Sequence, residues 1–286
     1  MNGLELIMDY FQYAFFQRAF LSGLAAALLC SLLGVFVVLR RSSMIGEGVA
    51  HLSFGGIALG LFLSIYPLYT AMILALVGTL AISLLQRKKI VYSETAIGII
   101  FSLGLALGAV LASMAGGFNV DLFGYLFGSI LTVTGDDLVL MGIFTALITA
   151  FLLIFYKEMV QMTFDEQGAR LSGVPVGMFE VVFNISIALT VVVSIKIVGS
   201  LLISALIIIP AASALQISRS FKTTVLWSVL LALVAVVCGL FTSVLFDIAT
   251  GGAIVIYSVF IFILTVLMKR FVLPRSAGMD RPLCDE

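Results

Sequence analysis

The chain has 286 residues, of which 62% are hydrophobic and only 10% are charged. A soluble globular chain usually carries about 25% charged residues, so this composition excludes an ordinary water-soluble enzyme. The formal net charge is zero, which gives no indication of a nucleic-acid partner. The composition therefore predicts an integral membrane protein surrounded by lipid.

Long apolar runs recur along the chain. A helix needs about 20 apolar residues to cross a hydrocarbon layer about 30 Å thick. The candidate spans are Ala19–Leu39, Gly48–Ile65, Leu68–Leu85, Thr95–Ala115, Leu138–Tyr156, Val181–Ile195, Ile197–Gln216, Thr223–Phe246 and Ile248–Met268. Their length and their lack of alternation favour helices over barrel strands. We therefore expect an all-α, polytopic transmembrane helical bundle of eight or nine spans, with Lys196 separating the sixth candidate from the seventh.

The basic residues predict the orientation of the bundle. All of them except Arg18 and Lys196 fall in alternate connections or in the C-terminal segment. Short cytoplasmic loops are enriched in Lys and Arg, so these connections are expected on the cytoplasmic side. Nine spans then place the N-terminus outside. We expect one transmembrane domain over residues 1–273 and a disordered cytoplasmic tail over residues 274–286.

The outer connection Gly116–Asp137 is longer than a turn. It contains an apolar run, Leu122–Val133, that is too short to span and predicts a re-entrant or surface helix. Its acidic residues include Asp136 and Asp137. We expect these carboxylates to be solvated, although they could also guide a cation or meet a delivery protein.

The cytoplasmic connection Met159–Gly177 is polar and carries both signs of charge. Asp165, Glu166 and Arg170 precede a glycine and a proline. The segment could form one or two helical turns that lie against a partner. A solvated connector is the alternative, and the length of the segment does not decide between them.

Glu47 and His51 are the strongest candidate site residues. His51 is the only histidine of the chain, and it lies in an otherwise apolar segment. Residues four apart share one helical face, so a carboxylate and an imidazole could bind one cation there. If the helix begins near Arg41, His51 lies about 15 Å deep, where ionisable groups are costly and usually functional. Alternatively, Glu47 only caps the helix and His51 hydrogen-bonds to a neighbouring helix.

The chemistry of this pair favours a borderline divalent ion. Imidazole and carboxylate together suit Zn²⁺, Mn²⁺ or Fe²⁺ better than Ca²⁺ or Mg²⁺, which prefer shells of oxygen ligands. We expect such an ion as a transported substrate, with no cofactor bound permanently. Two ligands do not complete a coordination shell, so others must come from elsewhere.

The chain is not expected to be an enzyme. It contains no GxxxxGK[ST] sequence, so it has no P-loop for ATP. Any ATP hydrolysis that drives transport must therefore occur in a separate subunit.

Pairs of glycines four residues apart predict close helix packing. The pairs are Gly56 with Gly60, Gly104 with Gly108, and Gly124 with Gly128.

Several stretches resemble the permease subunits of the zinc, manganese and iron ABC importers of bacteria and archaea. The run VVLRRSSMIGEGVAHLSFGGIALG is similar to the signature of their second helix. Further similar stretches follow in the order found in that family: SETAIGIIFSLGLALG, LFGYLFGSILTVTGDDL, FDEQGARLSGV and VGSLLISALIIIPAASA. Together they cover the chain from about Arg18 to Arg270.

The resemblance implies a type II ABC importer-like permease in the plasma membrane of a prokaryote. Its implied partners are a second copy of the permease, a cytoplasmic ABC ATPase and an extracytoplasmic metal-binding protein. It implies that Glu47 and His51 line the metal path and that Phe164–Val174, with Asp165, Glu166 and Arg170, couples to the ATPase. The family usually has Asp at the position of Glu47 and a proline within the stretch of Phe54–Gly56. Glu47 keeps the charge but reaches one methylene further.

The expected function is therefore the translocation subunit of an ATP-driven importer for Mn²⁺, Zn²⁺ or Fe²⁺. A permease for a metal chelate or vitamin is one alternative, although a large organic ligand has no special need for Glu47 or His51. A secondary metal transporter or channel that works without ATP is another. An intramembrane enzyme is disfavoured, because the spans show no clustered Asp pair and no Ser/His arrangement.

Overall fold

A computed structural model of the protein describes residues 12–88, 91–114 and 120–272. Within these ranges the chain is helical and has no strand. The helices of membrane-spanning length and apolarity are α2 (Ala14–Leu39), α3 (Met44–Phe62), α4 (Pro67–Arg87), α5 (Ser93–Met114), α7 (Gly135–Ile154), α10 (Val176–Val198), α12 (Phe221–Phe246) and α13 (Thr250–Val272). The shorter elements are α6 (Val120–Phe127), the 3₁₀ turn η1 (Ile130–Thr132), α8 (Tyr156–Phe164), α9 (Glu166–Leu171) and α11 (Ile203–Ile217). The predicted polytopic helical bundle is confirmed, while the predicted tail 274–286 lies outside the described residues.

Local sequence signals explain where several of these helices begin. Pro67 occupies the first turn of α4, where its missing N–H costs nothing. Capping boxes start α7 at Thr134 and α12 at Ser220, each satisfying backbone donors that the first helical turn leaves free. The apolar character of the helices extends around their circumference, as expected for helices between lipid and protein.

The boundary predicted at Lys196 is wrong. Lys196 lies in the last turn of α10, and the chain bends only after it, at Gly199. The expected span Ile197–Gln216 is divided between the end of α10 and the 15-residue helix α11. At 1.5 Å per residue α11 is about 22 Å long, which is short of the hydrocarbon thickness. It is therefore not among the eight helices of membrane-spanning length that the described residues form.

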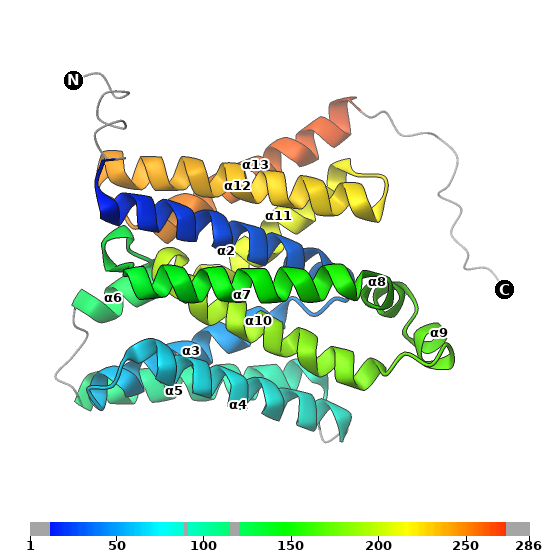
Figure 1. The fold of residues 1–286 in the computed structure, drawn as a ribbon, viewed down its shortest axis with the longest axis horizontal. Helices are drawn as coiled ribbons and strands as arrows, with labels where there is room; N and C mark the ends of the chain where they lie inside the picture. The colour runs from blue at the N-terminus through cyan, green and yellow to red at the C-terminus, as the bar shows by residue number, and fades with distance from the viewer. Residues whose placement is uncertain (1–11, 89–90, 115–119, 273–286) are drawn as a thin grey trace.

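The helices run between two ends of the molecule, as Figure 1 shows with α6 at the left-hand end and α8 and α9 at the right-hand end. The end that carries α8 and α9 also carries the connections after α2, α4 and α11. The basic residues at this end are Arg40, Arg41, Arg87, Lys88, Lys157, Arg170, Arg219, Lys222, Lys269 and Arg270. The bias of cytoplasmic loops toward Lys and Arg identifies it as the cytoplasmic end. The other is the outer end.

Helix α3 packs very closely on α4 and α5. A side chain on Gly104 of α5 would collide with the backbone of Leu52, and one on Gly56 would lie 2.6 Å from the Cα atom of Ala71 in α4. The predicted packing role is thus confirmed for these glycines. It is wrong for Gly124, whose added side chain would make only ordinary contacts, while Gly128 allows a close approach to the end of α10.

The outer connection contains a short helix, as predicted, and it is tied to the end of α10. The Ser129 amide donates to the Lys196 carbonyl over 2.9 Å, and the Ser200 amide donates to the Tyr125 carbonyl over 2.9 Å. Gly128 and Gly199 both have positive φ, and a side chain on either would collide with the backbone of the other segment. Only glycine fits this close crossing, so the non-spanning backbone is covered by protein.

Candidate functional site

Glu47 and His51 lie on α3, near the cytoplasmic end. The helix begins at Met44, so Glu47 falls in its first turn and His51 lies seven residues, or about 10 Å, along it. The predicted depth of about 15 Å is therefore too large, because the helix begins three residues later than assumed. His51 still lies within a membrane-spanning helix of 19 residues.

His51 is buried but incompletely partnered. Its residue is 8% exposed, and the ring of Phe101 on α5 packs edge-on against the imidazole at a centroid distance of 4.2 Å. Among the described residues, its Nδ1 atom has no hydrogen-bond partner. The alternative that His51 hydrogen-bonds to a neighbouring helix through Nδ1 thus finds no partner within these residues. A buried imidazole nitrogen without a hydrogen-bond partner is a group that could bind a metal ion.

Glu47 is half-buried and lies close enough for its charge to act on the imidazole of His51. Within the described ranges its carboxylate has no ion-pair partner. The direction in which the Glu47 side chain leaves α3 follows from the surroundings of the residues before and after it. A side chain on Gly46 would lie 3.4 Å from Ile207 of α11, and one on Gly48 would lie 2.8 Å from Ile97 of α5.

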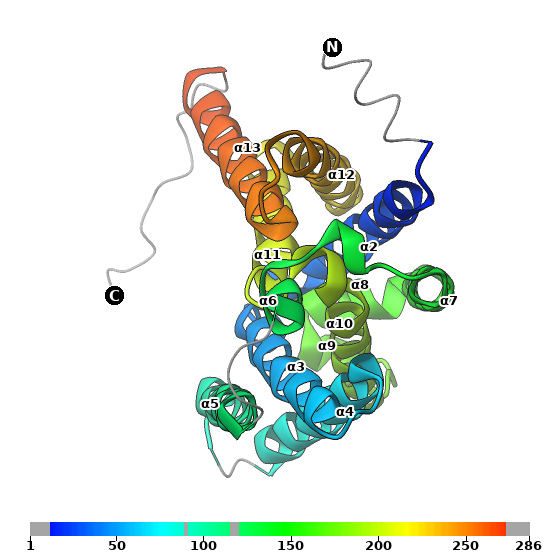
Figure 2. The same cartoon turned by 90° about the vertical axis from the view of Figure 1, so that its left-hand side faces the viewer.

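Because successive helical residues are about 100° apart, Glu47 leaves α3 between α5 and α11. Figure 2 shows these two helices on one flank of the molecule, on either side of α3. His51, one turn further along, lies on nearly the same face. We call this face the α3 flank.

One chain supplies only part of a metal shell. Among the described residues, no group of three or more His, Cys, Asp or Glu side chains could hold a metal ion. Glu47 and His51 are therefore two potential metal ligands on the α3 flank, without a third beside them in the described part of the chain.

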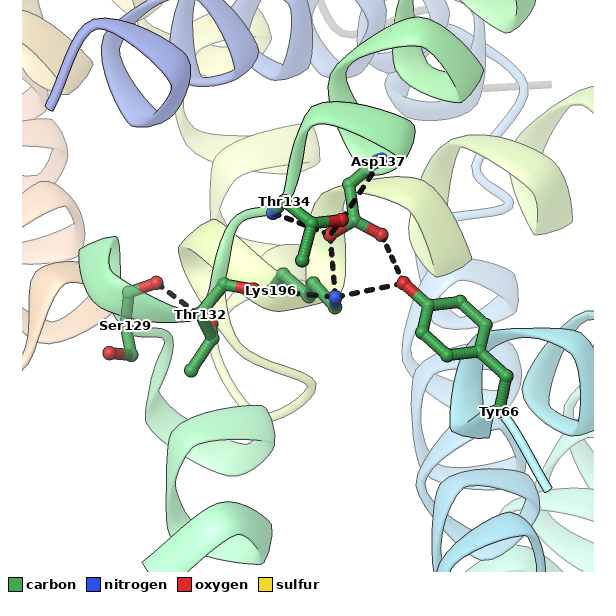
Figure 3. A network of polar contacts seen from close by, with 6 residues as sticks. All are labelled: Tyr66, Ser129, Thr132, Thr134, Asp137 and Lys196. Carbon is green, nitrogen blue, oxygen red and sulfur yellow. Dashed lines mark hydrogen bonds and ion pairs between the residues drawn. The ribbon is translucent and has the colours of Figure 1, made fainter. Parts of the chain in front are cut away.

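A second group of buried ionisable side chains lies at the outer end, and it is fully paired (Figure 3). Lys196 Nζ lies 2.6 Å from Asp137 Oδ2 on α7, and the two side chains are 5% and 10% exposed. Lys196 Nζ also donates to the Tyr66 hydroxyl over 3.0 Å and to the Thr132 carbonyl over 3.4 Å. The Tyr66 hydroxyl in turn donates to Asp137 Oδ1 over 2.5 Å. We call these residues, together with Thr134, the outer network.

The capping box of α7 completes this network. The Thr134 amide and hydroxyl both donate to Asp137 Oδ2, over 2.8 and 2.7 Å. Asp137 therefore accepts four hydrogen bonds, and the expectation that it is solvated is wrong. Lys196 departs from the pattern of cytoplasmic charge because it neutralises this carboxylate. Burial and the bond to Asp137 raise the pKa of Tyr66, which keeps its hydroxyl protonated as a donor.

The cytoplasmic connection forms α8 and α9 at the end of the bundle. Asp165 caps α9, since its carboxylate accepts from the Gly168 amide over 2.8 Å. Glu166 and Arg170 form an exposed pair at 2.6 Å along one face of α9. Phe164 is 65% exposed and Leu171 is 90% exposed.

A groove adjoins α9. It has a volume of about 690 Å³ and lies between the end of α4 and the start of α10, with Arg87, Glu166 and Arg170 among its lining residues. The Arg87 guanidinium donates to the Gly177 carbonyl, which joins α4 to the start of α10. The groove thus brings residues of α9 beside the contact between α4 and α10, and α4 packs on α3.

The comparisons with known proteins agree with this geometry. The profile of the ABC 3 transport family matches residues 12–269. The chain is 33% identical to the high-affinity zinc uptake system membrane protein ZnuB of Haemophilus influenzae, covering 88% of this chain and 96% of that protein. It is also 33% identical to the manganese import system permease protein ScaB of Streptococcus gordonii, covering 97% of this chain and 98% of that protein.

A solved structure shows the same fold. PsaBC from Streptococcus pneumoniae, in complex with a Fab, superposes with a TM-score of 0.84 at 30% identity, covering 94% of this chain and 98% of that chain. The protein is thus a helical, multi-pass permease of the cell membrane. It belongs to the ABC 3 transport family, and the resemblance seen in the sequence is confirmed.

Sequence reasoning missed the outer network. Lys196 and Asp137 are 59 residues apart, and Tyr66 lies 130 residues from Lys196, so no local pattern joins them. One signal was present. Lys196 is a basic residue outside the cytoplasmic pattern, and a buried lysine in a membrane protein requires an acidic partner.

Proposed function

We propose that the protein is the translocation subunit of an ATP-driven importer for a divalent transition metal, Mn²⁺, Zn²⁺ or Fe²⁺. The observation that carries this proposal is the pair of unpartnered ionisable side chains, Glu47 and His51, on one face of a membrane-spanning helix. Carboxylate and imidazole are the ligand types that these metals accept. The relatives named for zinc uptake and manganese import support a metal ion as the substrate.

The active unit is a dimer in which the α3 flank faces a second copy. One chain offers Glu47 and His51 and, within its described part, no third ligand beside them. A two-fold axis beside this flank brings a second pair opposite the first and yields four ligands, as many as a tetrahedral site needs. The second copy places its own Glu47 and His51 against the face between α5 and α11.

The cytoplasmic end binds a separate ABC ATPase. Helix α9 offers the exposed side chains of Phe164 and Leu171 and the charged pair Glu166 and Arg170. The neighbouring groove is lined by both signs of charge and suits a docked protein segment. The bond from Arg87 to the Gly177 carbonyl gives a route by which this contact acts on α4 and then on α3. An extracytoplasmic metal-binding protein delivers the ion at the outer end.

Radiometal uptake tests the proposed substrate. Cells that lack other importers for these metals are given this permease with its ATPase and its binding protein. ⁵⁴Mn, ⁶⁵Zn and ⁵⁵Fe uptake is then measured, each in competition with the other ions. We expect uptake of at least one ion, lost when the ATPase carries an inactivating change in its P-loop. Uptake that persists with the inactive ATPase would indicate a secondary transporter, and uptake of a chelate but of no free ion would indicate a chelate permease.

Charge reversal on α9 tests the coupling role. Replacing Asp165 and Glu166 together by Lys is expected to separate ATP hydrolysis from uptake, because it removes the cap of α9 and inverts its charge. Asp165→Asn is the matched control, since Asn caps a helix as well as Asp does and only the charge is lost. ATPase activity is compared with metal uptake in proteoliposomes. Normal coupling in the double variant would mean that α9 is only a connector.

A further inference from the structure

An apolar groove runs along the outside of the bundle between α2, α7 and α12. Its volume is about 300 Å³, at the small end for a ligand site. Figure 2 shows α2 and α7 on the side of the molecule away from α5, with α12 packed between α2 and α13. The groove therefore lies away from the α3 flank. Helix α7 has the smallest buried share of the membrane-length helices among the described residues, so this side faces lipid.

The walls of the groove suit a hydrocarbon chain. Leu32 and Phe36 of α2 form one side, and Leu152 of α7 forms another. One polar atom interrupts this lining. The hydroxyl oxygen of Thr149 is buried and has no hydrogen-bond partner among the described residues.

The cytoplasmic mouth of the groove is polar and basic. Tyr156 and Lys222 line it there, and the Tyr156 ring packs against Phe221 at a centroid distance of 5.8 Å. Lys222 is exposed, and it has no ion-pair partner within the described part of the chain. Tyrosine and lysine at the end of a spanning helix mark the level of the lipid headgroups.

The groove is shorter than one lipid leaflet. From Thr149 to the end of α7 at Ile154 is five residues, or about 8 Å of helix, and Tyr156 follows at the start of α8, whereas the hydrocarbon of one leaflet is about 15 Å thick. The groove thus begins at the headgroup level and ends within the cytoplasmic leaflet.

We propose that this groove binds an anionic phospholipid of the cytoplasmic leaflet. The upper part of one acyl chain lies between α2, α7 and α12, and the headgroup phosphate pairs with Lys222. The charge of Lys222 selects an anionic lipid over a zwitterionic one, because a basic residue near the membrane surface contributes about 1 kcal/mol toward anionic lipids. The bound lipid fills the contact between α7 and the rest of the bundle.

Native mass spectrometry of the full-length permease in mild detergent tests this proposal. The protein is titrated with phosphatidylglycerol and, separately, with phosphatidylcholine of the same acyl chains. We expect phosphatidylglycerol to bind about fivefold more tightly, the ratio that one such lysine produces. Lys222→Gln should remove this preference. Lys88→Gln is the matched control, because Lys88 is an exposed lysine of the cytoplasmic end that lies at the end of α4, outside the groove.

A second variant tests the acyl-chain contact. Thr149→Phe fills the groove and should reduce the binding of both lipids while Lys222 is still present. The proposal is overturned if wild type binds the two lipids equally, or if Lys222→Gln and Lys88→Gln lose the preference to the same extent.

Photo-crosslinking identifies the occupant directly. A photoreactive maleimide on Leu153→Cys, an exposed position in the groove, should capture phosphatidylglycerol in proteoliposomes. Capture of a second copy of the permease instead would show that the groove is a protein interface and would overturn the lipid assignment.

Discussion

Two groups of buried ionisable side chains lie in this membrane protein, and they differ in how they are satisfied. In the outer network, Asp137 accepts from Lys196, Tyr66 and Thr134, so that its charge is balanced and its oxygens are bonded. On α3, Glu47 and His51 have no comparable partners among the described residues. Charges in a membrane interior are costly in both cases. The first group offsets this cost within the protein, and under the proposed function the transported ion offsets it for the second.

This difference separates a structural role from a functional one. A paired network stabilises the fold, and removing one member leaves the other charge buried alone. An unpaired group has no ion pair to lose, so its removal should affect transport far more than stability. The two groups therefore predict opposite outcomes for the same kind of substitution, and each of the following changes tests that contrast.

The largest effect is expected on uptake from the α3 pair. Glu47→Ala or His51→Ala should lower metal uptake by more than 100-fold, because loss of residues that merely support a metal ligand already costs about 10- to 100-fold. Glu47→Ala should leave the melting temperature unchanged, because the carboxylate has no ion-pair partner among the described residues, whereas His51→Ala should lower it modestly, because the buried imidazole packs against Phe101. Radiometal uptake and thermal unfolding in detergent measure the two quantities.

Two controls accompany these variants, one elsewhere on α3 and one at Glu47 itself. Ser53→Ala removes a hydroxyl that is already bonded to the Val49 carbonyl and should leave uptake normal. Glu47→Asp keeps the carboxylate and should retain uptake. Normal uptake in both alanine variants would show that Glu47 and His51 do not form the metal site.

The second effect is on stability and arises in the outer network. Lys196→Met leaves Asp137 buried without a counter-charge, which should lower the free energy of unfolding by about 3–5 kcal/mol. The double variant Lys196→Met with Asp137→Leu should recover most of this loss, because no charge remains buried. Thermal unfolding of the wild type and of both variants measures the effect.

Arg18→Met provides the matched control. Arg18 is the other basic residue outside the cytoplasmic pattern, but it is exposed, so its loss should change stability by less than about 0.5 kcal/mol. An equal loss in both single variants would mean that the pairing in the outer network adds nothing to stability.

The sequence was sufficient to predict the helical bundle and the candidate pair, because both depend on local features. Apolar runs predicted each long helix, and the spacing of Glu47 and His51 alone placed them on one face. The sequence failed where distant segments meet. The bend at Gly199 was missed because it depends on a close crossing with Gly128, and the pairing of Asp137 was missed because Lys196 comes from another helix.

A smaller effect should follow from tightening the contact that positions His51. Gly104→Ala places a methyl group against the backbone of Leu52, next to the carbonyl of His51. Such overpacking should cost about 1–3 kcal/mol and should also reduce uptake, because α3 must shift. Gly142→Ala in α7 is the control, since nothing lies within 4 Å of an added side chain there. Gly142→Ala should leave stability unchanged or raise it. An equal loss of stability in both variants would show that the close contact between Gly104 and Leu52 has no special importance.

The smallest effect is expected for Tyr66→Phe, which removes one member of the outer network without leaving a charge unpaired. Asp137 keeps its bonds to Lys196 and Thr134, so the loss should be about 1 kcal/mol. The sign of its pH dependence follows from the raised pKa of Tyr66. The unfolded phenol ionises near pH 10, before the folded one, so the contribution of Tyr66 is complete below that pH and is lost above it. The difference in melting temperature between wild type and Tyr66→Phe should therefore be constant from about pH 6 to pH 9 and shrink above about pH 10. A difference that grows with pH would mean that the hydroxyl ionises within the network, and that Lys196 pairs with a phenolate as well as with Asp137.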